Sequence, residues 1–298
     1  MREVYRARDS KLGREVDPPA DRERFSDEMK EELEAGKELA IGAGAILAGH
    51  YSGSVSVHWK GYDNPVTAAD REASEFLVTE LKRLFPQDGI VCEETPDDRV
   101  RLTKSRVWMV DPMDGTKEFI SHCDEFAVMI GLAVDGKPRL GIVYQPLTGK
   151  LYYAASGMGA FLEEGHTTIP LRVSPESDPA AMTIALSRSH HSRRVDAIRH
   201  RLAITQTLRA GSIGLKVGMI CERRAHLYLN TSGGTYQWDS CAPEAILLEA
   251  GGRMTDLFNA PLQYNRHELQ NSNGVIASSG TIHARIVEAA RSVLRREA

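Results

Sequence analysis

Two carboxylates, Asp111 and Asp114, stand three residues apart directly after the apolar run at residues 107–110, which reads as a short buried strand. Gly115 follows and permits a sharp turn, and residues 116–120 read as the start of a helix. Acids delivered to the end of a strand, ahead of a helix N-terminus, can hold cations against an anion. Asp-Pro and Asp-Gly are also common turn dipeptides, so the motif taken alone fits a plain turn equally well.

Three other acidic sites favour a functional interpretation. Glu93 and Glu94 close a second short apolar run at residues 89–91, Asp70 lies at a predicted helix start, and Asp239 precedes a predicted helix of small residues. Each has a structural explanation of its own, because an acid in the first turn complements the helix dipole and paired glutamates usually form a solvated face. Solvent exposure explains less well why several elements each place an acid beside apolar residues.

Such a cluster suits the hydrolysis of a phosphate ester. Mg²⁺ prefers oxygen ligands and is typically held by one or two carboxylates together with substrate phosphate. Two such ions about 4 Å apart can activate a water and stabilise the leaving oxygen. The sequence contains no plausible Ser-His-Asp or Cys-His signature and no Gly-x-x-x-x-Gly-Lys phosphate loop, and nothing in it argues for a covalent intermediate.

The composition is that of an ordinary globular protein. The chain has 298 residues, of which 42% are hydrophobic and 26% charged, and its net charge is −4. Nothing indicates binding to a nucleic-acid polymer, no apolar run approaches the length of a membrane span, and the charged N-terminal stretch lacks the apolar region of a secretory signal. We expect a soluble, cytoplasmic protein whose four widely spaced cysteines are reduced: Cys92, Cys123, Cys221 and Cys241.

Periodicity places the elements that must position these acids. Residues 1–25 lack periodicity and are predicted to form a flexible arm. An antiparallel meander is predicted over 126–162, and alternating elements after residue 170 indicate an α/β second half. The remaining predictions are helices at 28–48, 67–85, 193–202, 215–221 and 242–250, and strands at 55–60, 182–187 and 225–229.

The combined order of these motifs resembles the inositol monophosphatase superfamily over about residues 30–290. The matching segments are Glu93-Glu94, Asp111-Pro-Met-Asp-Gly-Thr116 and Trp238-Asp239. The resemblance implies a layered αβαβα sandwich of the inositol monophosphatase/fructose-1,6-bisphosphatase type, with two packed lobes. It also implies a Mg²⁺-dependent, lithium-sensitive phosphatase that holds two or three ions in each site.

The same resemblance implies the division of the chain and the roles of its residues. An N-terminal α+β lobe at 26–170 would carry most metal ligands, and a C-terminal α/β lobe at 171–298 would carry Asp239 and the substrate contacts. The implied metal ligands are Glu93, Asp111, the carbonyl of Met113, Asp114 and Asp239. Asp70 and Thr116 would orient and deprotonate the attacking water, with Glu93 also in the catalytic group, and the amides of Gly115 and Thr116 would hold phosphate oxygens.

Further segments resemble the 3′(2′),5′-bisphosphate nucleotidase branch, whose members act on 3′-phosphoadenosine 5′-phosphate in sulfur metabolism. They are Lys117-Glu118-Phe119, Ser187-Arg188-Ser189-His190, Gly211-Ser212 with Leu215-Lys216, and Pro261-Leu262-x-Tyr264. A substrate with two phosphates needs an anion site away from the metals, and cationic side chains and hydroxyls suit it. The predicted substrate contacts are Gly115, Thr116, Lys117, Ser189, His190, Ser212, Lys216 and Asp239, with Arg188 as a further cation.

Several alternatives stay open. His190 also fits an exposed loop, Lys216 fits a surface lysine, and Cys92 fits either an oxidation-sensitive thiol or an inert buried one. The reaction predicted is the conversion of 3′-phosphoadenosine 5′-phosphate to AMP and phosphate. The alternatives are an inositol monophosphatase and a catalytically silent metabolite-binding protein of the same fold. The expected partner is a small phosphorylated metabolite, without stable membrane insertion, bound by a monomer or a homodimer.

Overall fold

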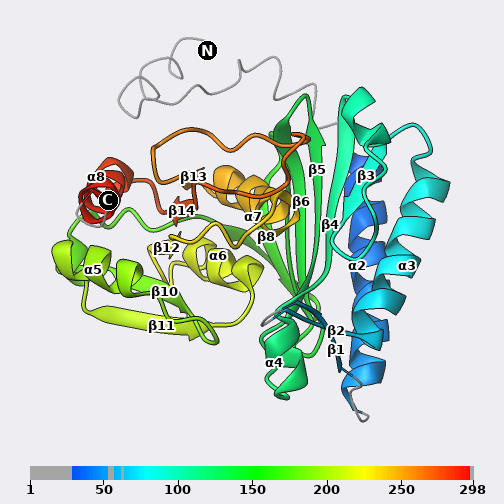
Figure 1. The fold of residues 1–298 in the computed structure, drawn as a ribbon, viewed down its shortest axis with the longest axis horizontal. Helices are drawn as coiled ribbons and strands as arrows, with labels where there is room; N and C mark the ends of the chain where they lie inside the picture. The colour runs from blue at the N-terminus through cyan, green and yellow to red at the C-terminus, as the bar shows by residue number, and fades with distance from the viewer. Residues whose placement is uncertain (1–28, 53–56, 62–63, 296–298) are drawn as a thin grey trace.

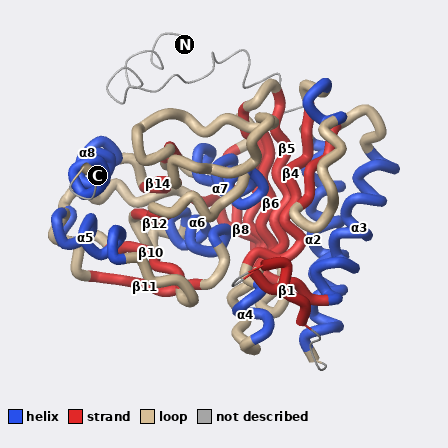
Figure 2. Tube along the Cα trace, viewed as in Figure 1, coloured by secondary structure: helices blue, strands red, loops and turns tan. Residues whose placement is uncertain are grey.

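The computed structural model describes residues 29–52, 57–61 and 64–295, so the predicted arm at 1–25 lies outside the described residues. Figure 1 shows five layers in the order helices, sheet, helices, sheet, helices. The αβαβα architecture expected from the resemblance is therefore confirmed. Figure 2 separates the two sheets by their red strands.

The larger sheet has seven strands in the order β3-β4-β5-β6-β7-β8-β9. β3 pairs parallel with β4, and every later neighbour pairs antiparallel. The predicted meander is confirmed and extends one strand further than expected. Its strands are β3 (Gly89–Cys92), β4 (Arg106–Asp114), β5 (Ala127–Val134), β6 (Lys137–Gln145), β7 (Lys150–Ala155), β8 (Gly159–Glu164) and β9 (Thr167–Leu171).

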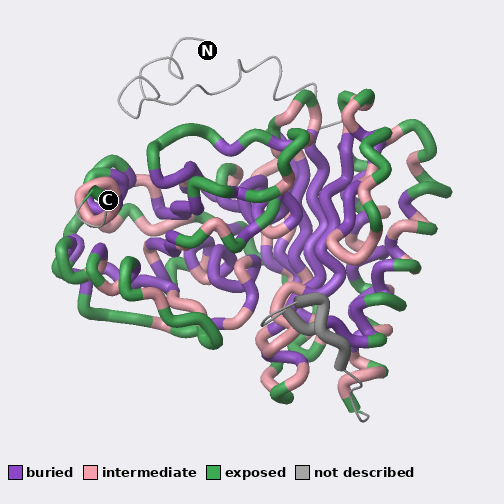
Figure 3. The backbone as a smooth tube through the Cα atoms, viewed as in Figure 1, coloured by how far each residue is buried: buried purple, intermediate pink, exposed green. Residues whose placement is uncertain are grey.

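Helices cover both faces of this sheet, which explains why β5 is a continuous apolar run and why the middle of β6 is buried. One face packs against α2 (Lys30–Tyr51) and α3 (Ala68–Leu84), and the other packs against α6 (Ile213–Cys221) and α7 (Gln237–Glu249). Figure 3 shows the central strands buried between these layers. The smaller elements of this half are the hairpin β1 (Val57–Gly61) and β2 (Asn64–Thr67), α4 (Thr116–Ile120) and the 3₁₀ turn Val100–Thr103.

The second sheet has five strands in the order β11-β10-β12-β14-β13. Its outer face packs against α5 and α8 through a third apolar core. The first sheet ends at Leu171 and the second begins at Thr183. The elements are the 3₁₀ turn Pro179–Ala181, β10 (Thr183–Ser187), α5 (Arg193–Arg201), β11 (Gln206–Ala210), β12 (Leu227–Asn230), β13 (Arg253–Thr255), β14 (Val275–Ser278) and α8 (His283–Leu294).

Two of the predicted boundaries that were wrong lie beside the acids. β4 does not stop before Asp111 but continues to Asp114, with an irregular register between the two acids. α7 begins at Gln237 instead of residue 242, because the Asp239 carboxylate accepts the backbone N–H of Tyr236 (2.7 Å) and so caps an earlier helix start. Pro243 therefore lies inside the helix, where it withholds one hydrogen bond from the carbonyl of Asp239.

Glycines allow α7 to approach the large sheet closely. A Cβ on Gly141 of β6 would lie 2.1 Å from the carbonyl oxygen of Ala242, and one on Gly131 of β5 would lie 2.8 Å from the nitrogen of Ala242. The helix that carries Asp239 thus rests directly on strand backbone. No helix in the described part of the chain combines the length and the apolar character that crossing a bilayer requires.

Candidate active site

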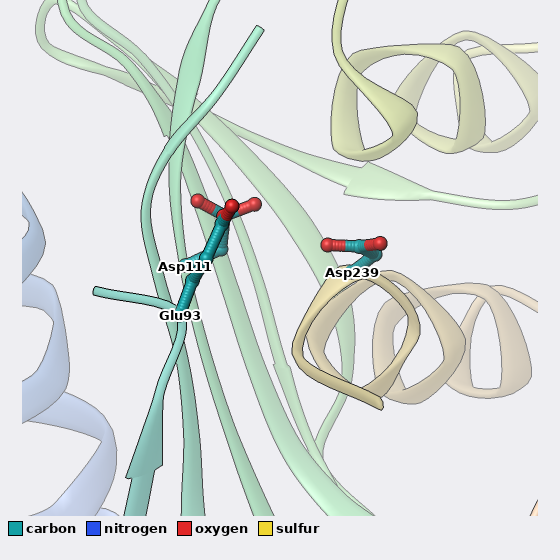
Figure 4. A group of neighbouring side chains, drawn as sticks. All are labelled: Glu93, Asp111 and Asp239. Atoms are coloured by element: carbon teal, nitrogen blue, oxygen red, sulfur yellow. The ribbon is translucent and has the colours of Figure 1, made fainter. Parts of the chain in front are cut away.

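Three acids from three elements converge at one point between the sheets. Asp111 lies in β4, Glu93 directly follows the neighbouring parallel strand β3, and Asp239 lies in the first turn of α7. The N–H of Glu93 donates to the carbonyl of Val110 (3.1 Å), which continues the pairing of the two strands and sets the acids side by side. One carboxylate oxygen of each acid lies within 4.8 Å of the others. Figure 4 shows Asp239 pointing from its helix toward Glu93 and Asp111.

The electrostatics of this group favour a bound cation. Asp111 is 2% exposed, and burial together with the charges of Glu93, Asp114 and Asp239 holds its pKa well above the usual range. The pKa of Asp239 is raised in the same way, by burial first and then by Glu93 and Asp114. An all-oxygen set of crowded carboxylates is the donor chemistry of a hard divalent ion, so these residues fit the metal that the sequence implies.

Asp114 is held differently from the other three acids. Its Oδ2 accepts hydrogen bonds from the hydroxyl of Ser212 (2.6 Å), the N–H of Gly214 (3.2 Å) and the N–H of Ile213. The carboxylate therefore caps α6, and one of its oxygens is committed to that helix. Ser212, a predicted substrate contact, is completely buried in this arrangement and is absent from the described residues that line the cleft.

Asp70 and Thr116, the predicted water-orienting pair, lie together. The N–H and hydroxyl of Thr67 both donate to Oδ2 of Asp70 at 2.6 Å, which caps α3 with its own third residue. The hydroxyl of Thr116 lies 3.2 Å from Oδ1 of Asp70 and 3.3 Å from the carbonyl oxygen of Met113. Burial raises the pKa of Asp70 to about 6, although the hydrogen bonds from Thr67 oppose the shift.

A cleft of about 940 Å³ opens over the acids. Its lining includes the predicted contacts Gly115, Thr116, Lys117, His190 and Lys216, besides the acids Glu93, Asp111, Asp114 and Asp239. The lining also contains Arg193, Arg194 and Arg209, which the sequence did not single out; with His190 they are named the basic wall. A signal for two of them existed, since they follow the helix-capping residue Ser192 at the predicted start of a helix.

Two predicted contacts turn toward other acids. The hydroxyl of Ser189 donates to Glu118, and Ser189 is not among the described cleft-lining residues. The guanidinium of Arg188 pairs with both carboxylate oxygens of Glu125, at 2.6 and 2.5 Å. Glu118 itself lines the cleft, so Ser189 reaches the lining only through that acid, whereas neither Arg188 nor its partner Glu125 is among the described lining residues.

The surface interpretation of Lys216 was wrong. Lys216 is 1% exposed, and its ammonium donates to the carbonyls of Ala210 (3.3 Å) and Gly211. Burial lowers its pKa to about 8, and the nearby charge of Asp114 opposes the shift. Lys216 is thus a buried cation that borders the cleft beside the acids. His190 is exposed, as the loop interpretation expected, and also lines the cleft.

Cys92 is a buried thiol. It is 1% exposed, its sulfur lies 3.2 Å from the hydroxyl of Ser74, and burial raises its pKa to about 11. Because thiolates are the species that oxidants attack, this environment favours the inert interpretation over oxidation sensitivity.

Comparison of this sequence with known proteins identifies the family to which it is similar. Residues 28–295 match the model of the Inositol monophosphatase family. A 3′(2′),5′-bisphosphate nucleotidase CysQ from Salmonella typhimurium is 37% identical over 239 residues, which cover 79% of this chain and 95% of the relative. The CysQ of Aggregatibacter actinomycetemcomitans is 34% identical over 235 residues, covering 78% of this chain and 86% of the relative.

Solved structures agree on the fold. An IMPase from Thermotoga maritima superposes with a TM-score of 0.76 at 25% identity, covering 90% of this chain and 100% of that one. CysQ from Bacteroides thetaiotaomicron superposes with a TM-score of 0.73 at 27% identity, covering 84% of this chain and 98% of that one.

Proposed function

This chain belongs to the inositol monophosphatase family, and on that premise we propose that it is a Mg²⁺-dependent 3′(2′),5′-bisphosphate nucleotidase. It converts 3′-phosphoadenosine 5′-phosphate to AMP and phosphate. The observation that carries the proposal is the cleft itself, whose lining combines the acid cluster with the basic wall. The relatives at 34 and 37% identity are named 3′(2′),5′-bisphosphate nucleotidases, which supports a nucleotide bisphosphate as the substrate.

Oxygen ligands from both halves of the chain would hold two or three Mg²⁺ ions. The proposed ligands are Glu93, Asp111, the carbonyl of Met113, Asp114 and Asp239. When bound, Mg²⁺ supplies Lewis-acid stabilisation of phosphoryl oxygens and lowers the pKa of a water. Asp114 can serve through Oδ1 while Oδ2 remains committed to α6.

Asp70 and Thr116 orient the attacking water and remove its proton. With its hydroxyl hydrogen directed at Oδ1 of Asp70, the oxygen of Thr116 is free to accept a hydrogen bond from the water. Asp70 has a pKa of about 6, so it is ionised at neutral pH and still basic enough to accept a proton. The two hydrogen bonds from Thr67 hold Oδ2 of Asp70 in place. They therefore fix the orientation of Oδ1, which faces Thr116.

The amides of Gly115 and Thr116 would hold oxygens of the phosphate that is cleaved. Gly115 has φ of 106°, a conformation that favours glycine, and a Cβ there would lie 3.0 Å from the carbonyl of Glu125. The turn between β4 and α4 therefore requires the glycine that the sequence supplies.

The second phosphate of the substrate needs cations away from the metals, and the basic wall supplies them. We assign it to His190, Arg193, Arg194 and Arg209, with Lys117 and Lys216 as further cations of the lining. Arg209 is steadied by a bond to the carbonyl of Ser187 (3.0 Å). An inositol monophosphate has no second phosphate for this wall, which favours the nucleotide bisphosphate as substrate.

The proposed compartment is the cytoplasm. Cys92, Cys123, Cys221 and Cys241 are all free thiols, and free thiols fit a reducing compartment.

Phosphate release from three substrates tests the proposal. With Mg²⁺ present, kcat/KM for 3′-phosphoadenosine 5′-phosphate should exceed that for inositol 1-phosphate and fructose 1,6-bisphosphate by at least ~10-fold. Chelation of Mg²⁺ should abolish release, and lithium should inhibit it. Glu38→Gln, which removes an exposed charge from α2, serves as the active control.

A preference for inositol 1-phosphate would replace the proposal with an inositol monophosphatase. No phosphate from any of the three substrates would favour the catalytically silent binding protein.

A further inference from the structure

One aromatic pair at the edge of the cleft has no part in the hydrolysis. The rings of Tyr236 and Trp238 are nearly parallel, with centroids 4.8 Å apart and 7° between their planes, and both residues line the cleft. Trp238 is 9% exposed, whereas Tyr236 is 39% exposed. Trp238 therefore covers one face of the Tyr236 ring, while Tyr236 remains an exposed residue.

Backbone contacts hold Tyr236 firmly in place. Its N–H donates to Oδ2 of Asp239 (2.7 Å), and its carbonyl accepts from the side-chain amide of Asn271 (2.8 Å) and the hydroxyl of Ser240 (3.3 Å). A β-bridge to Gln270 adds a further restraint. The backbone of Tyr236 is therefore tied to the same residue, Asp239, that joins the acid cluster.

The other large aromatic side chains of the cleft are not placed to receive a planar ligand. Among the described tyrosines and tryptophans that line it, Tyr228 is 4% exposed and lies under the ammonium of Lys216, 5.2 Å from its ring centroid. Trp238 is covered by Tyr236 itself. Tyr236 is the exposed member of this group.

We propose that the exposed face of Tyr236 stacks on the purine base of the substrate and determines its preference for a nucleotide. The inference rests on the proposed function, because it assumes that a nucleotide bisphosphate occupies the cleft. Aromatic faces bind planar bases by stacking and do so with any base. The puckered ring of an inositol has no π-face, so this contact discriminates between the two substrate classes of the family.

The test compares Tyr236→Leu with Tyr236→Phe on two substrates that carry the same phosphates. One is 3′-phosphoadenosine 5′-phosphate, and the other is a methyl ribofuranoside 3,5-bisphosphate, which lacks the base. Tyr236→Leu should raise KM for the nucleotide about 5- to 150-fold, the range to which about 1–3 kcal/mol of base stacking corresponds, with kcat little changed. Tyr236→Phe should resemble the wild type, and neither variant should change KM for the riboside.

Two further measurements make the outcomes distinct. Calorimetric binding of AMP should weaken in Tyr236→Leu by the same factor as KM, a readout that needs no turnover. Phe258→Leu, at an exposed aromatic outside the described cleft lining, is the matched control and should change nothing.

If the wild type hydrolyses the nucleotide but Tyr236→Leu affects both substrates equally or not at all, the stacking role is wrong and the proposed function stands. If the wild type neither hydrolyses the nucleotide nor binds AMP, both fail.

Discussion

Single residues in the acid cluster, the proposed metal ligands, destabilise the fold when no metal is bound. Asp111 is buried among acids that raise its pKa, and the N–H of Met113 donates to it at 2.9 Å. An asparagine could accept the same hydrogen bond without a charge. The carboxylate is therefore a site at which stability and function oppose each other.

Asp111→Asn should reverse the order of stability when metal is added. In EDTA at pH 8 we expect the variant to be more stable than the wild type by about 0.5–2 kcal/mol. With Mg²⁺ at about 100 times its Kd, the wild type gains about 2.7 kcal/mol and the variant much less. Thermal unfolding of both proteins, with Glu38→Gln as the control, measures the difference; a variant that is less stable in EDTA would contradict the argument.

His283, at the start of α8, is a buried neutral histidine whose tautomer follows from its partners. The hydroxyl of Thr255 donates to the carbonyl of Asp256, so it accepts from Nε2–H of His283 (2.8 Å). Nδ1 is then the acceptor for the hydroxyl of Ser278 (2.8 Å). Protonation would set a second N–H against that hydroxyl, in a place where burial already lowers the pKa to about 4.

Because this pKa is lower in the folded state than its ordinary value of 6.5, the unfolded chain binds more protons between these limits. The contribution of neutral His283 is complete above pH 6.5 and falls by about 3 kcal/mol as the pH drops to 4. Urea unfolding of the wild type and His283→Gln across this range isolates it, since the variant cannot gain the proton. The exposed His166→Gln is the control, and parallel pH profiles for wild type and His283→Gln would refute the assignment.

At the scale of elements, the sequence predicted what periodicity and turn residues can encode. The helix at α3 and the strands of the meander were found because apolar patterns and turn glycines mark them. β13, of three residues, and β14, buried on both faces, give no alternation to detect, and both were missed. The start of α7 was misplaced because it depends on a contact between Asp239 and Tyr236 that spacing alone does not show.

Gly141→Ala should separate α7 from the sheet. A methyl group 2.1 Å from the carbonyl of Ala242 forces strand or helix to move, so we expect a loss of about 1–3 kcal/mol in the free energy of unfolding and weaker Mg²⁺ binding through Asp239. Gly49→Ala in α2 meets nothing within 4 Å and should instead gain about 0.5–1 kcal/mol. Chemical denaturation measures both variants. If Gly141→Ala is as stable as the wild type, the contact between residue 141 and Ala242 relaxes without an energetic cost.

At the scale of the whole molecule, Asp114 links the large sheet to a helix that follows the second sheet's edge strand. It lies at the end of β4, and its carboxylate caps α6. Sequence could predict the acids that meet, because each carries a motif. It could not predict that the hydroxyl of Ser212 donates to Asp114, nor that Arg209 from β11 lines the cleft. Both contacts depend on how the layers pack.

Ser212→Ala tests this link against the substrate contact that the sequence predicted. Removing one of three donors to a partly buried carboxylate should cost about 1.5–3 kcal/mol of unfolding free energy. KM for the nucleotide should change less than ~2-fold if the hydroxyl does not touch substrate. Urea denaturation and steady-state kinetics on one preparation separate the roles, since a raised KM at unchanged stability would restore the substrate contact.

The acid cluster also has a consequence for the time course of folding. Glu93 and Asp111 come from neighbouring strands, but Asp239 joins them only after α7 has packed on the sheet. A cation that needs all three acids can bind only a nearly native chain, so it stabilises the native state without stabilising the folding transition state. Mg²⁺ should then slow unfolding in stopped-flow experiments and leave the refolding rate unchanged. The ion would thereby increase the kinetic stability of the protein.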